Sequence, residues 1–142
     1  MTVAKMGVAE LRKFLHEEFP QAFRGGEITI ESADGKTSLL RQRYSDTMLR
    51  PGGTVSGPTL MALADCAMYV VLLSAIGPVG LAVTTSLNIN FLRKGAPGQD
   101  VLAAARLMKL GKRLAVGEVN LFSGGTPDPI AHATTTYSIP DT

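Results

Sequence analysis

The stretch Gly57–Ile76, GPTLMALADCAMYVVLLSAI, is almost wholly apolar and carries one charge, that of Asp65. Pro58 suits the first position of a helix and Gly77-Pro78 is a strong stop signal, so the stretch predicts one long helix. Apolar residues fall on every face of this helix, which is typical of a helix enclosed by protein or lipid. We therefore expect the rest of the chain to wrap around it.

Asp65 lies too far along this helix to cap its N-terminus. A lone carboxylate is costly to bury among apolar side chains, and that cost is most often tolerated at a functional site. Because burial disfavours the ionised form, a carboxylate in such a setting is also a better base near neutral pH. Asp65 is therefore the first candidate catalytic residue. The alternative is a structural aspartate whose oxygens accept hydrogen bonds from hydroxyl or backbone N–H groups.

The composition restricts the class of protein. A chain of 142 residues predicts one domain, residues 1–142. With a net charge of +2 and 6% aromatic residues there is no basic patch with interleaved aromatic residues, so nucleic acid is not an expected partner. The single cysteine, Cys66, excludes an internal disulfide, and charges interrupt the N-terminal segment where a secretory signal would be apolar. We expect a cytoplasmic protein.

The apolar stretch is about as long as a membrane span. Its small residues, its internal charge and the alternating segments on both sides favour a core helix instead, so we expect no membrane partner. Only two histidines are present, His16 and His132, and neither they nor Cys66 have metal-ligand spacing. We therefore expect no metal site.

The segment before the central helix predicts a helix and a hairpin. Residues 4–19 place apolar residues at helical spacing and end before Pro20, so residues 1–20 are interpreted as an amphipathic helix and linker. Residues 27–44 hold two alternating runs around the turn sequence Ala33–Lys36, which predicts a β-hairpin. Residues 45–53 contain Pro-Gly-Gly, a sequence typical of loops, and are interpreted as a loop.

The segment after the central helix predicts four strands. The clearest begins at residue 83 and alternates strictly, so that Thr85 and Asn90 are expected on opposite faces and Thr84 on the face of Asn90. Three more alternating runs follow at residues 100–110, 113–122 and 129–139, and their short connections imply antiparallel neighbours. The expected class is α+β, with a curved antiparallel sheet of about six strands around the central helix.

Three motifs fit this order of elements: GGTVSGPTLMALAD (52–65), VTTSLNINFLRK (83–94) and the GKR turn (111–113). Together they resemble the hotdog-fold acyl-CoA thioesterases of the PaaI-like type, including the 4-hydroxybenzoyl-CoA thioesterase branch. The resemblance covers about residues 27–139. It implies a hotdog fold and an enzyme that hydrolyses an acyl-CoA thioester to a free acid and coenzyme A, which is then part of the substrate and not a separate cofactor.

The resemblance also assigns the two catalytic groups. Gly57 stands where the family uses a backbone N–H to polarise the thioester carbonyl, and Asp65 stands where the family has an Asp or Glu nucleophile or general base. Relatives usually begin this helix with His-Gly-Gly, whereas this chain has Ser56-Gly57-Pro58. Ser56 is expected to cap the helix or to bond the substrate. Because the histidine is missing, the alternative function is a non-catalytic hotdog protein that binds acyl-CoA or another small ligand.

Further substrate contacts are implied by the same resemblance. Four cations are expected to contact coenzyme A, with solvated turn charges as the alternative: Arg93, Lys94, Lys112 and Arg113. Tyr69 follows Asp65 by four residues and shares its helical face, so it either lines the acyl pocket, bonds the acid or packs in the core. Thr85 is expected near the acyl group, and Asn90 makes a structural hydrogen bond or a substrate contact.

The spacing of the two catalytic groups predicts an oligomer. Eight residues of helix, at about 1.5 Å each, separate Gly57 from Asp65 by roughly 12 Å, too far for both to reach one carbonyl group. They must then come from different chains, with two central helices side by side across a two-fold axis. The resemblance implies this homodimer through pairing of residues 84–92 with their symmetry mate, and a dimer of dimers beyond it.

Overall fold

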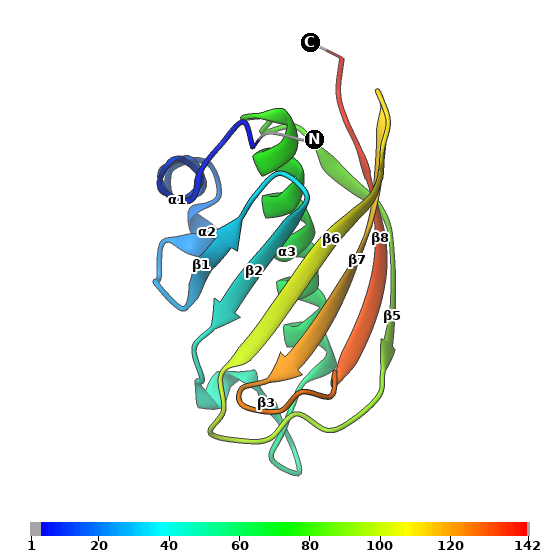
Figure 1. Ribbon diagram of the computed structural model, residues 1–142. Helices are drawn as coiled ribbons and strands as arrows, with labels where there is room; N and C mark the ends of the chain where they lie inside the picture. The colour runs from blue at the N-terminus through cyan, green and yellow to red at the C-terminus, as the bar shows by residue number, and fades with distance from the viewer. Residues whose placement is uncertain (1–3, 142) are drawn as a thin grey trace.

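The structure, a computed structural model, describes residues 4–141 and consists of a curved main sheet, a small two-stranded sheet, a long helix against the main sheet and a helical N-terminal segment (Figure 1). The helices are α1 (Val8–Glu18), α2 (Pro20–Phe23), the 3-10 turn η1 (Asp46–Met48) and α3 (Gly57–Ile76). The strands are β1 (Ile28–Ala33), β2 (Thr37–Gln42), β3 (Leu49–Arg50), β4 (Thr54–Val55), β5 (Val83–Phe91), β6 (Val101–Leu110), β7 (Leu114–Ser123) and β8 (Ala131–Ser138).

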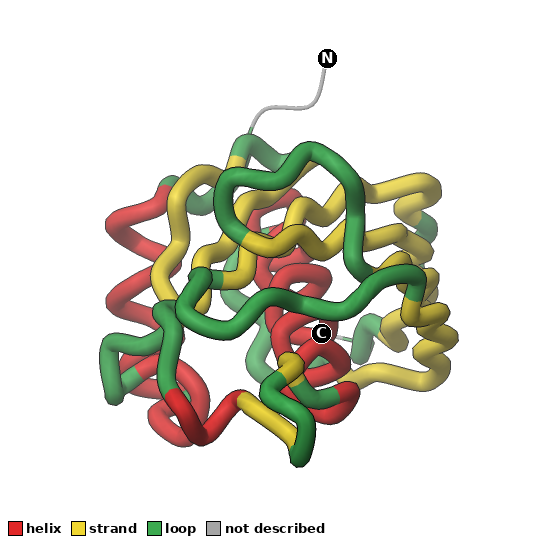
Figure 2. The backbone as a smooth tube through the Cα atoms, turned by 90° about the horizontal axis from the view of Figure 1, so that it is seen from below, coloured by secondary structure: helices red, strands yellow, loops and turns green. Residues whose placement is uncertain are grey.

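The main sheet has six strands in the order β1-β2-β6-β7-β8-β5, and every neighbouring pair is antiparallel. Strands β1 and β5 are therefore its edges. Figure 2 shows the strands curving around α3, with the other helices beside it. The predicted α+β architecture is confirmed: an antiparallel sheet of six strands wraps around one long helix, and a further helix precedes it.

Local sequence signals fix both ends of α3. Ser56 is the N-cap, and its Oγ accepts a hydrogen bond from the backbone N–H of Thr59 at 3.3 Å. The helix begins at Gly57, one residue before the predicted start, and Pro58 lies in its first turn, where no N–H is needed. It ends where Gly77 adopts a φ of 97°, a conformation that residues other than glycine rarely adopt.

Most of α3 is buried in the core. By length and composition alone it could cross a membrane, but 72% of its most apolar window is buried inside the structure. The core therefore accounts for its apolar character. Its N-terminal half leaves one strip uncovered, formed by Pro58, Met61 and Ala62, with the half-buried Asp65 at its end. The helix is thus enclosed on most of its faces, and this strip stays exposed in the single chain.

The N-terminal segment packs across the opening of the curved sheet. Leu11 and Leu15 of α1 are fully buried, and Arg12 donates to the carbonyl oxygen of Ile30 at 3.0 Å. Pro20 ends α1 as predicted, but it also starts the short helix α2, because proline is well tolerated in a first helical turn. Phe19, between the two helices, places its ring 6.4 Å from that of Tyr69.

Strand β5 contains a β-bulge that the alternation did not predict. Thr84 pairs with Tyr137 and Ser86 pairs with Thr136, so Thr85 is an extra residue in β5. An extra residue reverses which face the preceding side chains occupy. Thr84 therefore faces α3, whereas Thr85 is exposed and donates its hydroxyl to the carbonyl oxygen of Thr136 at 3.2 Å. The predicted faces of these two threonines are wrong for this reason.

Gly117 of β7 allows α3 to approach the sheet closely. A Cβ at this position would lie 2.5 Å from the sulfur of Met68 and 2.8 Å from the carbonyl oxygen of Arg106. Since the backbone oxygen cannot move as a side chain can, we expect Gly117→Ala to lower the free energy of unfolding by about 1–3 kcal/mol. Urea denaturation measures this change.

Gly25→Ala is the matched control for that substitution, because a Cβ there would meet only Glu27, at 3.9 Å, and the glycine φ is not positive. We expect the control to stay within about 0.5 kcal/mol of the wild-type protein. Equal midpoints for the two variants would contradict the close packing at Gly117.

Candidate active site

Asp65 is held by two hydroxyl groups from the sheet. Its Oδ1 accepts a hydrogen bond from Thr84 Oγ1 at 2.6 Å and another from Tyr137 Oη at 2.9 Å. The Tyr137 hydroxyl also lies 3.2 Å from the backbone oxygen of Asp65. Within residues 4–141 no donor bonds Oδ2, so one carboxylate oxygen is anchored and the other is available.

The two donors come from neighbouring strands. The bulge in β5 turns Thr84 towards α3, and Tyr137 is directed inward by the alternation of β8, in which Ala133 and Thr135 are also buried. Neither residue was predicted as a site residue. A signal existed for Tyr137, because the hydroxyl of a buried tyrosine usually needs a partner. No comparable signal existed for Thr84, since the bulge could not be read from the alternation.

The groups next to Asp65 are protonated. Burial is the main cause that raises the pKa of Tyr137 above its ordinary value, and the charge of Asp65 raises it further. Burial, followed by the charge of Asp65, raises the pKa of the Cys66 thiol to about 12. Tyr137 is therefore a hydrogen-bond donor and Cys66 is an unreactive core thiol.

Two pockets adjoin Asp65, one on each side. A pocket of about 330 Å³ lies towards β5 and is lined by Tyr69, Thr84 and Tyr137 among others. A second pocket of about 480 Å³ lies towards α2 and is lined by both apolar and polar side chains, among them Ala22, Ala62 and Glu27. Phe19 and Asp65 line both pockets. The carboxylate thus borders space large enough for an acyl group.

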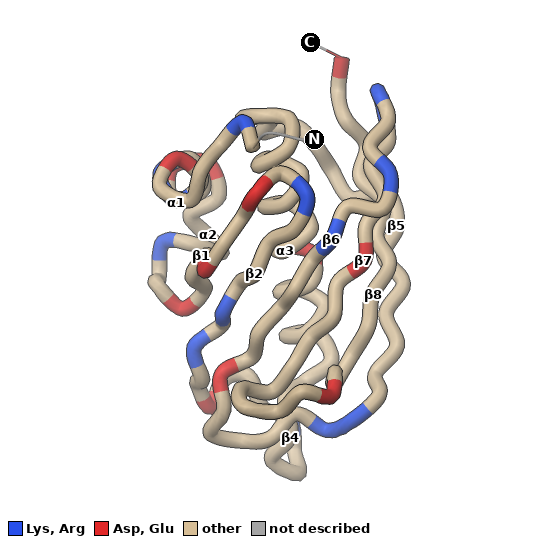
Figure 3. Tube along the Cα trace, viewed as in Figure 1, with Lys and Arg blue, Asp and Glu red and all other residues tan. Residues whose placement is uncertain are grey.

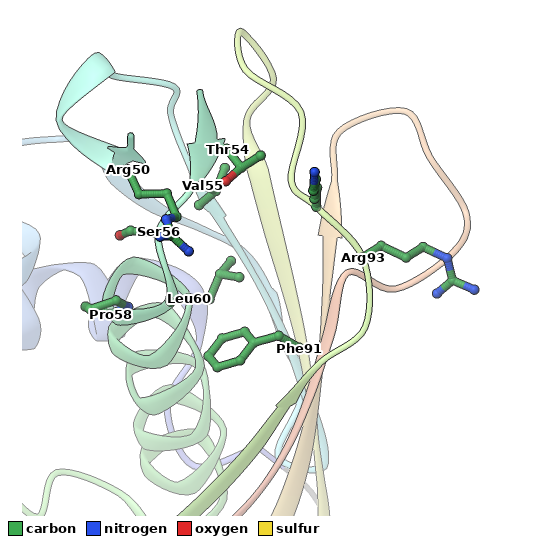
Figure 4. A pocket seen from close by; sticks show the side chains of 10 residues that line it. Arg50, Thr54, Val55, Ser56, Pro58, Leu60, Phe91 and Arg93 are labelled. Atoms are coloured by element: carbon green, nitrogen blue, oxygen red, sulfur yellow. The ribbon is translucent and has the colours of Figure 1, made fainter. Parts of the chain in front are cut away.

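Gly57 opens a third pocket, of about 450 Å³, at the N-terminus of α3 (Figure 4). Among the described residues, no acceptor bonds its backbone N–H, as expected in the first turn of a helix. The unpaired N–H groups there carry roughly half a positive charge. The ring of Phe91 would lie 3.2 Å from a Cβ at this position, so only glycine leaves the N–H open without displacing that ring.

Three cations line this third pocket: Arg50, Arg93 and Lys94. Figure 4 shows Arg50 extending over the helix N-terminus beside Ser56, whereas Arg93 points away from it. The guanidinium of Arg93 donates to the carbonyl oxygen of Pro129 at 2.8 Å. Arg50 has no ion pair within residues 4–141. It was not predicted as a site residue, because its short strand β3 lies in a segment interpreted as a loop.

Lys112 and Arg113 lie at the other end of the sheet. The turn that holds them precedes Leu114, which pairs with Ser138 of β8. Ser138 also pairs with the first residue of β5, whereas Arg93 and Lys94 follow the last residue of β5. Figure 3 shows basic residues at both ends. Arg113 pairs with Asp141 at 2.9 Å, and both side chains are exposed. One chain therefore does not bring the four predicted cations together.

The remaining predicted residues divide between the site and the surface. Tyr69 is buried and lines the pocket towards β5, but its hydroxyl donates to the carbonyl oxygen of Val79 at 3.4 Å and not to Asp65. Thr85 and Asn90 are exposed on β5, and none of the three pockets includes them. Tyr69 therefore lines a pocket and packs in the core, two of the three alternatives given for it, and it does not bond Asp65 in the single chain. The contacts of Thr85 and Asn90 with a substrate stay predictions.

The histidines take no part in this arrangement. His16 is exposed on α1, and His132 contacts Glu118 at 3.1 Å on the outer face of the sheet. In the part of the chain that the structure describes, no group of three or more His, Cys, Asp or Glu side chains could hold a metal ion.

Comparisons with known proteins identify the family of the chain and its fold. Residues 52–130 match the family model of the thioesterase superfamily. A protein from Silicibacter sp. TM1040, provisionally assigned as a thioesterase, is 43% identical over 99% of this chain and 96% of its own, with a TM-score of 0.90. No curated protein matches the chain.

Two more distant structures share the fold. Zebra fish thioesterase superfamily member 2 is 19% identical, with a TM-score of 0.84 over 96% of this chain and all of its own. The Escherichia coli PaaI protein of the phenylacetic acid degradation operon is 22% identical, with a TM-score of 0.76 over 92% and 95%. These likenesses confirm the predicted hotdog fold.

Proposed function

Because the chain belongs to the thioesterase superfamily, we propose that it hydrolyses an acyl-CoA thioester to a free acid and coenzyme A. The observation that carries the proposal is the orientation of Asp65, with one oxygen anchored and the other available beside two pockets. A Streptococcus mutans protein of the same fold, 23% identical with a TM-score of 0.73, was crystallised with acetyl CoA. That complex supports acyl-CoA as the ligand class.

Asp65 supplies the attacking group in one of two ways. As nucleophile, Oδ2 bonds the thioester carbonyl carbon, the C–S bond breaks, coenzyme A leaves as the thiolate, and water then hydrolyses the mixed anhydride. As general base, Oδ2 takes a proton from water while the resulting hydroxide attacks the same carbon and displaces the thiolate. Both routes yield the free acid, and both need the available oxygen of Asp65.

Gly57 of a second copy polarises the carbonyl in this proposal. Within one chain the roughly 12 Å of helix between Gly57 and Asp65 keeps them from acting on one carbon. β5 is an edge strand nine residues long, and Val83 and Phe91 at its ends are each more than half exposed. Such an edge is a template for pairing with another chain. The exposed strip of α3 adjoins it, so a two-fold partner would cover both.

The same pairing would bring the four predicted cations to one end of the joined sheet. In an antiparallel β5–β5 pair, the end of one strand lies beside the start of the other. Arg93 and Lys94 of one copy would then lie at the same end of the joined sheet as the turn of the other copy that carries Lys112 and Arg113. We propose that this end, with Arg50, receives the phosphates of coenzyme A.

Ser56 supports a second candidate function, the non-catalytic binding of acyl-CoA. In relatives a histidine usually stands here, whereas Ser56 Oγ accepts the N–H of Thr59 and lies 2.8 Å from its hydroxyl. The side chain that could replace the histidine is thus engaged in capping α3. A protein with this arrangement could hold the thioester without hydrolysing it.

A panel of aliphatic and aromatic CoA thioesters, assayed by thiol release, separates the two functions. The enzyme is expected to release coenzyme A from at least one member at a rate proportional to protein concentration. A binder would show a rise in melting temperature with the thioester and no release. Absence of both effects across the panel would contradict both functions.

A further inference from the structure

We infer that Tyr137 is a positioning residue, which anchors Oδ1 of Asp65 so that Oδ2 faces the substrate. The inference rests on the proposed hydrolysis and adds a residue to its machinery. Tyr137 does not reach the available oxygen, so its role is to act through Asp65.

The contacts of the Tyr137 hydroxyl favour one side-chain conformation of Asp65. The hydroxyl lies 2.9 Å from Oδ1 and 3.2 Å from the backbone oxygen of the same residue. A group that contacts both ends of one aspartate restricts rotation about its χ1 angle. Oδ1 also accepts the hydroxyl of Thr84, at 2.6 Å, so both of its lone pairs are used. Rotation of the carboxylate out of this position would break both bonds.

The Tyr137 ring is itself fixed in place. It is 4% exposed, and it stacks on the ring of Tyr69 with a centroid distance of 5.9 Å and an interplanar angle of 14°. Tyr69 lies one turn after Asp65 on the same face of α3. Through this stacking, α3 holds the Tyr137 ring in place, and the Tyr137 hydroxyl in turn holds the Asp65 carboxylate. The backbone of Tyr137 belongs to strand β8 of the sheet.

Protonation keeps this donor in place across the assay range. Burial raises the pKa of Tyr137, so the hydroxyl stays protonated at neutral and mildly alkaline pH. A general acid would lose its proton during turnover, whereas this tyrosine donates the same hydrogen bond throughout. Its loss should therefore change kcat more than substrate affinity, because Asp65 is displaced from the reacting carbon while the pockets keep their lining.

The experiment compares Tyr137→Phe with Tyr44→Phe in the full-length protein. Tyr44 also donates to a carboxylate, Asp46, at 2.6 Å, but it lines none of the three pockets described above. With the best thioester of the panel, we expect Tyr137→Phe to lower kcat by about 10- to 100-fold with KM within about two-fold, because a misplacement near 1 Å costs about that much. Tyr44→Phe is expected to keep both constants.

Several outcomes overturn the inference. The first is a kcat of Tyr137→Phe within about two-fold of wild type, and the second is a change confined to KM. The third is a variant that does not fold, because phenylalanine preserves the packing of the ring and only a structural role of the hydroxyl would then explain the loss. Wild-type protein without activity contradicts the proposed function instead. In that case a crystal structure of Tyr137→Phe decides: the inference expects Asp65 in another or a mixed conformation, and an unchanged, ordered side chain refutes it.

Discussion

Asp65→Asn is expected to lower kcat for the best acyl-CoA substrate by about 10²- to 10⁴-fold, the range for loss of a general base, and by more if the carboxylate is the nucleophile. The asparagine oxygen can still accept the hydroxyls of Thr84 and Tyr137, which leaves the amide nitrogen where Oδ2 was. An amide nitrogen neither attacks the thioester nor takes a proton from water. The substitution therefore removes the chemistry while preserving the anchoring contacts.

Asp128→Asn is the matched control, because Asp128 is exposed in the loop between β7 and β8. We expect it to match the wild-type protein in activity. Circular dichroism and light scattering should give both variants the wild-type fold and mass. Activity of Asp65→Asn within a few-fold of wild type would contradict the assignment of Asp65.

Mixed dimers of two inactive variants are expected to regain activity. Gly57→Pro removes the N–H at the start of α3, where the proline backbone fits a helix and the Phe91 ring must shift by a few tenths of an ångström to admit the added Cβ. Loss of one such donor costs about 10²- to 10³-fold. A mixed dimer with Asp65→Asn then contains one site with neither substitution. Random reassociation makes about half of the dimers mixed, each with one intact site of two, so about a quarter of wild-type activity should return.

The arrangement of the site decides the result of this mixing. If Gly57 and Asp65 of the same chain formed each site, every site in the mixture would carry one substitution and activity would stay at the level of the parents. The control is to mix the folded variants without denaturation, so that activity appears only as subunits exchange. An active monomer in light scattering would also contradict the shared site.

The long elements could be predicted because their signals are local. The start of α3 follows from Ser56 and Pro58, its end from Gly77, and its central place from its uniform apolarity. Strands β6 to β8 follow from alternation, because one face of each packs on the core. The short strands β3 and β4 were interpreted as loop, since two residues are too few to show a period.

The partners of Asp65 could not be predicted, because they depend on topology and on one irregularity. Asp65 itself was recognisable as the only charge in an apolar helix. Thr84 reaches Asp65 only because Thr85 is an extra residue in β5. Hydroxyl residues occupy both faces of this part of the edge strand, so the pattern of apolar and polar residues does not specify its register. Tyr137 reaches Asp65 because β8 lies beside β5, and this pairing aligns Tyr137 with Thr84, 53 residues earlier in the sequence.

Cys66 has a practical consequence for the thiol-release assay. It is the only thiol of the chain, it is 5% exposed, and burial raises its pKa to about 12. Only a thiolate attacks an aromatic disulfide reagent and releases its coloured thiolate, so the folded protein should contribute no colour to a measurement of released coenzyme A. In denaturant the same reagent will label this cysteine only when the core opens, so the labelling rate reports the frequency of global opening without any added probe.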